Sequence, residues 1–305
     1  MSNYAVANNS KLNRITLFDV IVNFFVILIT IAVAYPLYFC IIASFSDPTE
    51  VALGNTLLWI KDFTLEAYSY VFEEKQIWVG YRNTIIYTVL GTLYNLLLTI
   101  PAAYVMTKKY MPFHAFFSWF FFITMYISGG MIPTYMLMRD LHLLNNPLVM
   151  VVGAGVSCYN LIVTRQYFSS SIHPDIYEAA YIDGASELKC FTKIAMPLAK
   201  PIIAVMALYC GVSHWNSFYN AMIYLNEKKY EPLQLVLRRI LINSQMEALD
   251  MAADADLVTY LLRKQHMAQA MKYSVIFIAS LPLLVAYPFL QKYFTKGVMI
   301  GSVKG

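Results

Sequence analysis

Apolar residues gather in six stretches that are each long enough to cross a bilayer as a helix. A hydrocarbon core takes about 20 predominantly apolar residues in helical form. The predicted spans are residues 18–45, 82–106, 113–137, 147–165, 201–224 and 273–292. The segments 46–80 and 225–272 hold too many charges for hydrocarbon. We therefore predict an all-α integral membrane protein with six transmembrane helices and both termini on the same side.

Helix-breaking residues interrupt several of these spans. Pro36 predicts a kink in the first span, and Pro101 interrupts the second. The third span meets Ser128-Gly129-Gly130 and then Pro133, which should unwind its far end. Lining a cavity and packing closely against another helix at the glycines explain this pattern equally well.

The composition agrees with a membrane protein, with 59% hydrophobic and only 13% charged residues. The net charge of +4 comes without a basic stripe or a nucleic-acid-binding module, so we expect no nucleic acid partner. The four cysteines form no C-x-x-C pair, which argues against a disulfide framework or a metal site. Lys11 and Arg14 precede the first apolar run, as in a signal peptide, but that run is long enough to remain as a spanning helix.

The loop at residues 166–200 predicts two short helices joined at a glycine. Pro174 suits the first position of a helix, and Asp175 in the first turn complements the helix dipole. Gly184 can enter the left-handed conformation and end this helix, and Ser186 can cap the next. Three small side chains leave a surface that another protein could approach closely: Ala179, Ala180 and Ala185.

This loop resembles the cytoplasmic coupling loop in the permease subunits of bacterial ABC importers. The family signature is Glu-Ala-Ala, three residues, Gly, nine residues and Ile-x-Leu-Pro, and Met196 stands here where Leu is usual, a change of similar volume. The matching positions are Glu178, Ala179, Ala180, Gly184, Ile194, Met196 and Pro197, and Asp183, directly before the glycine, is a further candidate coupling residue. The resemblance implies that the loop docks into a groove on an ATPase subunit, where Glu178 could pair with a basic residue. The alternatives are an ordinary helical hairpin with a glycine cap, and a solvated carboxylate at Glu178.

Nearly the whole chain resembles the maltose-type second permease of carbohydrate importers, in particular the subset associated with polygalacturonate, rhamnogalacturonate and alginate oligosaccharides. The supporting segments are residues 128–135, 214–221 and 296–305. The resemblance implies the type I ABC importer permease fold and an oligosaccharide substrate. It also implies a second homologous permease, two ATPase subunits that bind ATP and Mg, and an extracytoplasmic solute-binding protein. This chain has no P-loop motif, so we expect it to bind no cofactor itself.

The same resemblance sets the topology, because lysine and arginine divide about equally between the two sets of loops. It places the chain in the bacterial inner membrane with both termini in the cytoplasm. The predicted parts are a cytoplasmic tail at residues 1–17, a transmembrane domain at 18–294 and a second tail at 295–305. In maltose-type systems the matching C-terminal tail reaches between the ATPase subunits, which would involve Gly301, Lys304 and Gly305. A frayed chain end is the alternative.

A polar cluster in the outer half of the fifth span is a candidate substrate pathway: His214, Trp215, Asn216, Tyr219 and Asn220. Asn216 and Asn220 are four apart and share a helix face, so both amides could meet sugar hydroxyls in one cavity. Trp215 and Tyr219 could stack on a sugar ring, and a protonated His214 could hold an anionic uronate. Alternatively, these residues bond neighbouring helices, and in the resembling transporters the principal sugar site lies on the other permease.

Two other classes of protein compete with the importer interpretation. An ion-coupled secondary transporter or channel would need ionisable residues at mid-membrane, and the spans contain almost none apart from His214. A membrane-embedded enzyme would need a catalytic constellation, and no HExxH, GxSxG or paired intramembrane carboxylate is present. We therefore expect a non-catalytic subunit.

Overall fold

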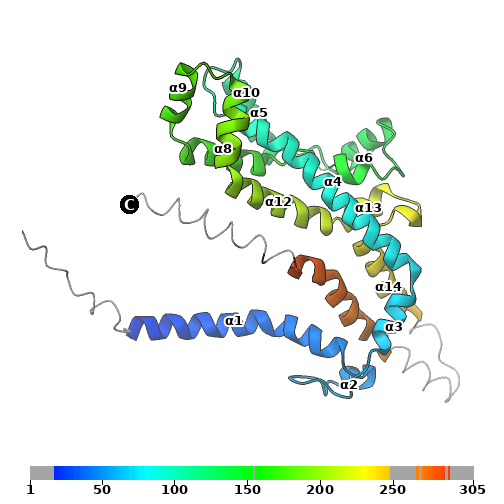
Figure 1. The fold of residues 1–305 in the computed structure, drawn as a ribbon. Helices are drawn as coiled ribbons and strands as arrows, with labels where there is room; N and C mark the ends of the chain where they lie inside the picture. Colours follow the sequence, from blue (N-terminus) through cyan, green and yellow to red (C-terminus); the bar gives the residue numbers. More distant parts are fainter. Residues whose placement is uncertain (1–16, 154, 248–265, 268–269, 286–287, 289–305) are drawn as a thin grey trace, which may run out of the picture. The chain divides into compact units, whose positions relative to one another are not determined.

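A computed structural model describes residues 17–153, 155–247, 266–267, 270–285 and 288 of the chain. The chain divides into two compact units, one formed by residues 1–68 with 253–277 and the other by 69–252 with 278–305. Every regular element among the described residues is a helix, and no strand occurs among them (Figure 1). The prediction of an all-α protein is confirmed.

The first unit is built on α1, which runs from Leu17 to Ser44 without a break at Pro36. None of the side chains in its most apolar stretch is buried within this chain, so their apolar surface is left for lipid or for another subunit. The short helix α2 (Pro48–Ala52) follows, capped by the Asp47 carboxylate. Within this unit the ring of Phe39 on α1 meets the ring of Tyr273 edge-on, with 5.4 Å between the ring centres. Tyr273 belongs to the apolar helix Ala270–Val285.

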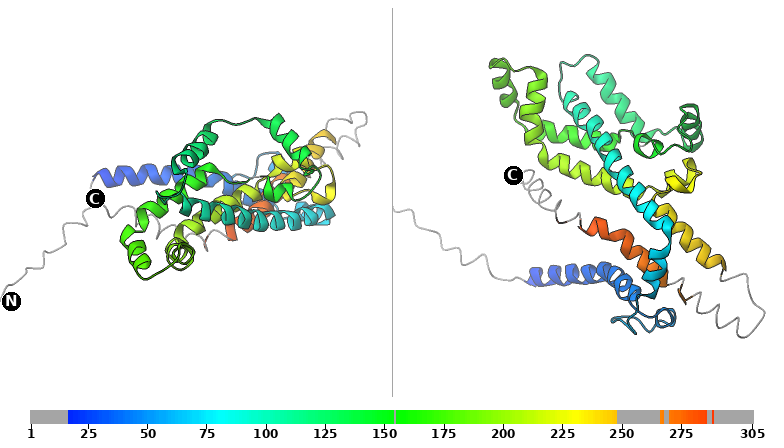
Figure 2. Two further views of the ribbon diagram at one scale, coloured as in Figure 1. Left: turned by 90° about the horizontal axis from the view of Figure 1, so that it is seen from above. Right: turned by 45° about the vertical axis from the view of Figure 1, so that its right-hand side comes forward.

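The second unit is organised around α4, which extends from Lys75 to Val105 with Pro101 inside it. Helices α7, α8, α12 and α14 pack against it (Figures 1 and 2). In chain order, the helical elements after α2, other than α4, are α3 (Glu66–Glu73), α5 (His114–Tyr126), α6 (Met131–Asp140), α7 (Val149–Val152), α8 (Cys158–Ser171), α9 (Pro174–Ile182), α10 (Glu187–Cys190), the π-helical turn η2 (Phe191–Ala195), α11 (Met196–Leu198), α12 (Lys200–Trp215), α13 (Phe218–Tyr224), the 3₁₀ turn η3 (Lys228–Tyr230) and α14 (Leu233–Glu247).

Three predicted spans are broken helices. The third divides into α5 and α6, bent by 116° around the predicted Ser128-Gly129-Gly130 break. The fourth was predicted as one helix and is not: α7 ends before Gly153, and Ser157 caps the new helix α8 by accepting from the Asn160 N–H at 3.4 Å. The fifth divides into α12 and α13 at residues 216–217.

By length and composition alone, two helices of the described part could each cross a membrane, Leu17–Ser44 and Lys75–Val105. The number rises to four when each bent pair is one span; the second such pair is Glu187–Leu198 with Lys200–Trp215, bent by 78°. The predicted last span corresponds to the shorter helix Ala270–Val285, and its predicted end falls partly outside the described residues.

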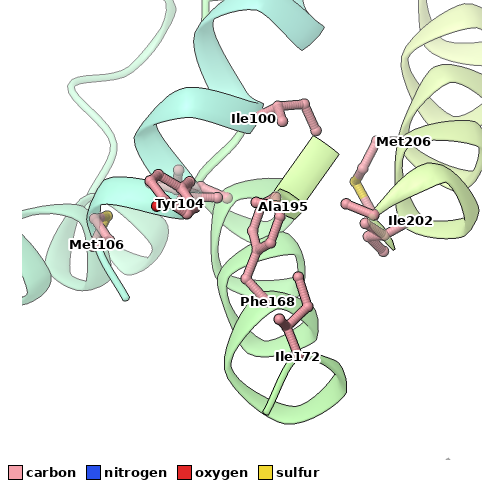
Figure 3. Close-up of a cluster of buried hydrophobic side chains, with 11 residues drawn as sticks. Ile100, Tyr104, Met106, Phe168, Ile172, Ala195, Ile202 and Met206 are labelled. Atoms are coloured by element: carbon pink, nitrogen blue, oxygen red, sulfur yellow. The ribbon is translucent and has the colours of Figure 1, made fainter. Parts of the chain in front are cut away.

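A buried apolar cluster fills the space where α4 ends, between α8, η2 and α12 (Figure 3). Phe168 of α8 and Met206 of α12 are almost completely buried there, together with Tyr104 from the last turn of α4. Burying a side chain of this size contributes roughly 1.5–3 kcal/mol of favourable transfer free energy. This cluster holds the base of the loop at residues 166–200, which resembles a coupling loop in sequence.

Candidate coupling site

The turn between α9 and α10 has the geometry that the sequence predicts. Pro174 is the first residue of α9, where its missing N–H leaves no helical bond unmade. The His173 ring nitrogen lies 3.1 Å from the Asp175 carboxylate in the same turn. Ser186 caps α10, and its hydroxyl accepts from the Lys189 N–H at 3.4 Å. Two short helices thus meet at Gly184, as expected.

Gly184 ends α9 with a Schellman motif. Its φ is +73°, a conformation that costs glycine little and strains residues with a Cβ. The Gly184 N–H donates to the Tyr181 carbonyl at 3.0 Å, and the Ala185 N–H donates to the Ala180 carbonyl at 2.9 Å. Both bonds satisfy carbonyls that the end of the helix would leave unpaired, so the turn is a fixed shape.

The tip of this loop exposes two large apolar side chains. Ile182 retains 88% of its accessible surface and Leu188 retains 71%, one on each side of the turn. The predicted residues Glu178, Ala179 and Asp183 are exposed beside them, and Ala180 is buried against the underlying structure. Exposed apolar residues rimmed by polar ones are typical of a protein-interaction surface.

The other predicted coupling residues form the base of the loop. Ile194 and Met196 are half-buried, and both Met196 and Phe191 pack against the core cluster of Figure 3. Pro197 is exposed in α11. The intervening η2 is π-helical, and such widened turns are frequent at functional sites. The loop therefore has an exposed tip and a base that continues into α12.

A carboxylate at the start of α10 ties the loop to the end of α4. Glu187 accepts hydrogen bonds from the hydroxyls of Tyr104 at 3.0 Å and Tyr181 at 2.5 Å, and also from that of Tyr110. The Lys108 ammonium lies 3.7 Å from the same carboxylate. We call these five residues the Glu187 cluster. It joins α9 and α10 to the polypeptide that leaves the membrane after α4.

The cationic partner in this cluster is enclosed by aromatic rings. The Lys108 ammonium lies 4.0 Å from the ring centre of Tyr177 and 4.7 Å from that of Tyr104, and its side chain is only 11% exposed. It also donates to the Tyr181 hydroxyl at 2.9 Å. Cation–π contacts strengthen when the cation is desolvated, so this enclosure favours a fixed position for Lys108.

The cluster keeps Glu187 ionised. Desolvation by burial acts to raise the pKa of this carboxyl, but the hydroxyls of Tyr110, Tyr181 and Tyr104 and the Lys108 charge outweigh it, so the pKa of Glu187 lies below its ordinary value. Desolvation, assisted by nearby Cys190 and Glu187, raises the pKa of Tyr177 to about 12. Desolvation and the bond to Glu187 raise the pKa of Tyr181. The tyrosines are therefore protonated donors around a charged acceptor at neutral pH.

The sequence interpretation missed the Glu187 cluster. Except for the local Tyr181–Glu187 pair, its bonds join residues separated by 73 to 83 positions in the sequence. No spacing rule links positions that far from each other. A signal was nevertheless available. Lys108 follows the second span, so the predicted topology places it on the same side of the membrane as the loop.

The predicted substrate-pathway residues separate into two groups in the structure, and His214 belongs to the buried one. Its ring nitrogen Nε2 lies 2.7 Å from the Asn95 side-chain oxygen on α4. The amide of Asn95 in turn donates to the Gly155 carbonyl. Gly91 faces the same ring, and a Cβ there would lie 2.4 Å from an imidazole carbon. His214 therefore bonds and packs against a neighbouring helix, the alternative raised for this cluster.

Trp215 is also buried, and its ring N–H donates to the Ala279 carbonyl at 3.1 Å. Asn216, Tyr219 and Asn220 are exposed. The predicted single helix face for Asn216 and Asn220 is wrong, because α12 ends at Trp215 and α13 begins at Phe218. Asn216 instead donates its amide to the Val212 carbonyl at 3.0 Å.

The predicted tail residues Gly301, Lys304 and Gly305 lie outside the described residues.

Fold and site together define a helical membrane protein with an exposed two-helix loop fixed to its transmembrane bundle. Residues 77–300 match the family model described as binding-protein-dependent transport system inner membrane component. LplC of Bacillus subtilis is 35% identical over 305 residues, covering all of both chains. The polygalacturonan/rhamnogalacturonan transport system permease YtcP of the same organism is 32% identical, covering 95% of this chain and 99% of the relative. A crystal structure of a bacterial ABC transporter involved in the import of the acidic polysaccharide alginate matches 96% of this chain and all of its own, with a TM-score of 0.79 and 30% identity.

The chain belongs to the family of binding-protein-dependent transport system inner membrane components. It is a permease subunit of an ABC importer and has the type I permease fold, and it is not an enzyme. Membership also implies an ATPase and a solute-binding protein as partners, with no cofactor on the permease itself. The secondary-transporter alternative is therefore set aside.

Proposed function

We propose that this permease imports oligosaccharides rich in uronic acid, driven by ATP and Mg on partner ATPase subunits. Two similarities support this substrate class. One relative at 32% identity is a permease for polygalacturonan and rhamnogalacturonan, and one structure at 30% identity belongs to an importer of alginate. These polymers share carboxylated sugars, which is the chemistry that we carry over to this chain.

The observation that best supports the mechanism is the exposed tip of the loop above its fixed base. Ile182 and Leu188 offer apolar surface, while Glu178 and Asp183 add negative charge beside it. We propose that this tip enters a groove on an ATPase subunit whose rim is basic. A rigid Schellman turn at Gly184 presents these side chains without ordering a flexible segment on binding.

The Glu187 cluster gives the proposed docking event a path to the membrane. Movement of α9 and α10 would displace Glu187, and the bonds to Tyr104 and Lys108 would transmit that displacement to the end of α4. Helix α4 packs on α8 and α12 along the bundle. Nucleotide and the loaded binding protein would bias the same two-state element from opposite ends.

The proposed assembly contains this chain, a second homologous permease, two ATPase subunits and an extracytoplasmic binding protein. Both termini of this chain face the cytoplasm of a bacterial inner membrane, since the loop must reach the ATPase. Gly301, Lys304 and Gly305 contact the ATPase subunits. Of the proposed sugar-pathway residues, Tyr219 and Asn220 are the exposed candidates for direct contact, and Asn216, His214 and Trp215 shape the surroundings.

Copurification from the native host tests this proposal. A tagged wild-type chain should recover one other permease and an ATPase. The Glu178→Lys/Gly184→Pro variant should lose the ATPase and keep the other permease. Asp175→Lys is a matched control, because it reverses an exposed charge on the same helix α9 but away from the tip. A chain that purifies alone, or an ATPase retained by the tip variant, would contradict the proposal.

Uptake measurements test the substrate class separately. Cells that contain this importer should accumulate labelled oligogalacturonate or oligoalginate, and disruption of this chain should abolish that uptake. A neutral maltooligosaccharide of equal length is the control. Uptake of the neutral sugar alone would overturn the substrate class and leave the importer mechanism standing.

A further inference from the structure

The loop after α2 folds back beside α1. The Tyr35 hydroxyl donates to the Leu57 carbonyl at 3.1 Å, and the Tyr38 hydroxyl donates to the Leu58 carbonyl at 2.6 Å. The loop returns to the end of α1, where the Lys61 N–H donates to the Ser46 hydroxyl at 3.1 Å. Figure 1 shows this excursion running back alongside the blue helix. Residues 57–60 therefore lie beside α1 itself, level with Tyr35 and Tyr38, and do not extend beyond its C-terminal end.

The depth of this loop follows from helix geometry. A helix rises 1.5 Å per residue, so Tyr38 lies about 9 Å and Tyr35 about 13 Å before the end of α1 at Ser44. Asp19 in the first turn marks the opposite edge of the hydrocarbon. About twenty residues cross the hydrocarbon core, which places its other boundary close to Cys40. By this measure Tyr38 lies about 3 Å and Tyr35 about 7 Å to the hydrocarbon side of that boundary, so the two tyrosines hold the loop in the outermost part of the hydrocarbon, next to the headgroups.

The polar groups of the loop suit this depth. Irregular backbone near hydrocarbon is costly unless its carbonyls have partners. Here two carbonyls of the loop, at Leu57 and Leu58, accept hydrogen bonds from the hydroxyls of Tyr35 and Tyr38 on α1. The charged residues Lys61 and Asp62 come only where the loop has returned to the end of the helix.

The side chains of the same segment are exposed and apolar. Leu57, Leu58 and Trp59 are 59%, 68% and 77% exposed. The neighbouring surface of α1 is equally unburied and apolar, as a surface in contact with lipid would be. Tryptophan and tyrosine are enriched at the membrane interface, where an apolar ring and a polar edge are both accommodated.

We propose that residues 57–60 form a membrane-interface anchor, with Leu57, Leu58 and Trp59 inserted among lipid at the end of α1. Such an anchor would fix the depth and tilt of the first span. The inference is independent of the proposed substrate and coupling mechanism. The proposed orientation of the chain places the anchor in the outer leaflet. The depth of the anchor in the membrane does not depend on that orientation.

Quenching of tryptophan fluorescence in the intact transporter tests the anchor. The complex would be placed in nanodiscs of phosphatidylcholine with or without bromine on the acyl chains near the headgroup. The contribution of Trp59 is the difference between wild type and Trp59→Phe, since the chain has four tryptophans. We expect bromolipid to remove most of this contribution and aqueous iodide to leave it. Quenching by iodide alone would overturn the proposal, as would protection from both quenchers, which would indicate a protein partner.

The role of the two hydroxyls is tested by a variant that removes nothing else. Tyr35→Phe/Tyr38→Phe keeps both rings in α1 and deletes the two donors. We expect Trp59 to lose its quenching by bromolipid and to become accessible to iodide. Tyr126→Phe, at a ring that is 70% exposed on α5, is the control and should leave the Trp59 signal unchanged. Wild-type quenching in the double variant would overturn the claim that these hydroxyls hold the loop at its depth.

Discussion

The hydroxyl of Tyr104, in the last turn of α4, donates a 3.0 Å hydrogen bond to the Glu187 carboxylate at the start of α10, across 83 residues of sequence. This bond joins the long helix at the centre of the bundle to the loop that we propose meets the ATPase. Tyr104 also contacts the rings of Phe168, Tyr177 and Phe191. One side chain therefore belongs both to the buried cluster and to the polar link above it.

Removing the Glu187 carboxylate should uncouple transport from ATP hydrolysis. In Glu187→Ala the exposed tip at Ile182 and Leu188 is unchanged, so the ATPase should still copurify. The hydroxyls of Tyr104, Tyr110 and Tyr181 lose their common acceptor, at a cost in stability on the order of 1 kcal/mol because the carboxylate is about half exposed. Proteoliposomes should show a several-fold lower ratio of sugar transported to ATP hydrolysed.

Two variants make this measurement specific. Glu187→Gln keeps an acceptor oxygen for the tyrosines but loses the charge facing Lys108, so its transport ratio should lie between those of wild type and Glu187→Ala. Asp175→Ala, another carboxylate at the start of a loop helix, should behave as wild type. An unchanged ratio in Glu187→Ala would show that the cluster transmits nothing.

Local rules explain why the loop could be predicted in detail. Pro174, Gly184 and Ser186 act on their own backbone neighbours, and the structure places each where the sequence predicts. The break of the third span at Gly129 and Gly130 was predicted for the same reason, since glycine acts on backbone conformation at its own position.

Features that depend on contacts between distant segments could not be predicted. The fourth span contains enough apolar residues for one helix, but it breaks at Gly155, whose carbonyl accepts from the Asn95 amide on α4, sixty residues earlier in the sequence. The charged segment 46–80 was placed outside hydrocarbon as a whole. Its charges flank an apolar tip at Leu57–Ile60 whose position depends on Tyr35 and Tyr38, about twenty residues earlier.

Substitution at Gly184 should weaken the ATPase interaction in the order set by left-handed backbone strain. Its φ of +73° is accessible to glycine, tolerated by asparagine and costly for alanine and valine. No atom lies within 4 Å of a Cβ built at this position, so steric clash makes no contribution. Recovery of the ATPase with the tagged chain should fall from Gly to Asn to Ala to Val, with a loss for alanine of roughly 1 kcal/mol. Equal recovery with valine would contradict the fixed turn.

Charge at the loop tip should abolish docking without unfolding the permease. Ile182 and Leu188 are 88% and 71% exposed, so aspartate at either position buries no charge in the isolated chain. In a docked complex the same carboxylate would be desolvated, a change worth on the order of 2 kcal/mol at an interface centre. The amount of ATPase recovered with the chain should fall at least tenfold. The thermal midpoint of the variant should equal that of the wild-type chain within the error of the measurement. Lys193→Asp, an exposed charge change on η2, tests whether any new negative charge has this effect.

Acid should weaken the Glu187 cluster. The pKa of Glu187 is below its ordinary value of 4.5, so its contribution to stability is fully present above pH 4.5 and is lost as pH falls through the lower value in the folded protein. Wild type should be more stable than Glu187→Gln at neutral pH, and the difference in thermal midpoint should shrink below about pH 4.5. A difference that grows on acidification would contradict the sign of this pKa shift.

Close packing between α4 and α12 can be tested at Gly91 and His214. A Cβ at residue 91 would lie 2.4 Å from the His214 ring, so Gly91→Ala should destabilise the chain by about 1–3 kcal/mol. Adding His214→Ala removes the clashing ring. The double variant should therefore lose less stability than the two single variants lose together, as measured by thermal midpoints of the purified complex. Gly211→Ala is the matched control on the facing helix, because a Cβ there meets its nearest neighbour, the Thr92 hydroxyl, at an ordinary 3.7 Å. Strict additivity of the Gly91 and His214 changes would refute the contact, and with it the role of His214 in packing these two helices.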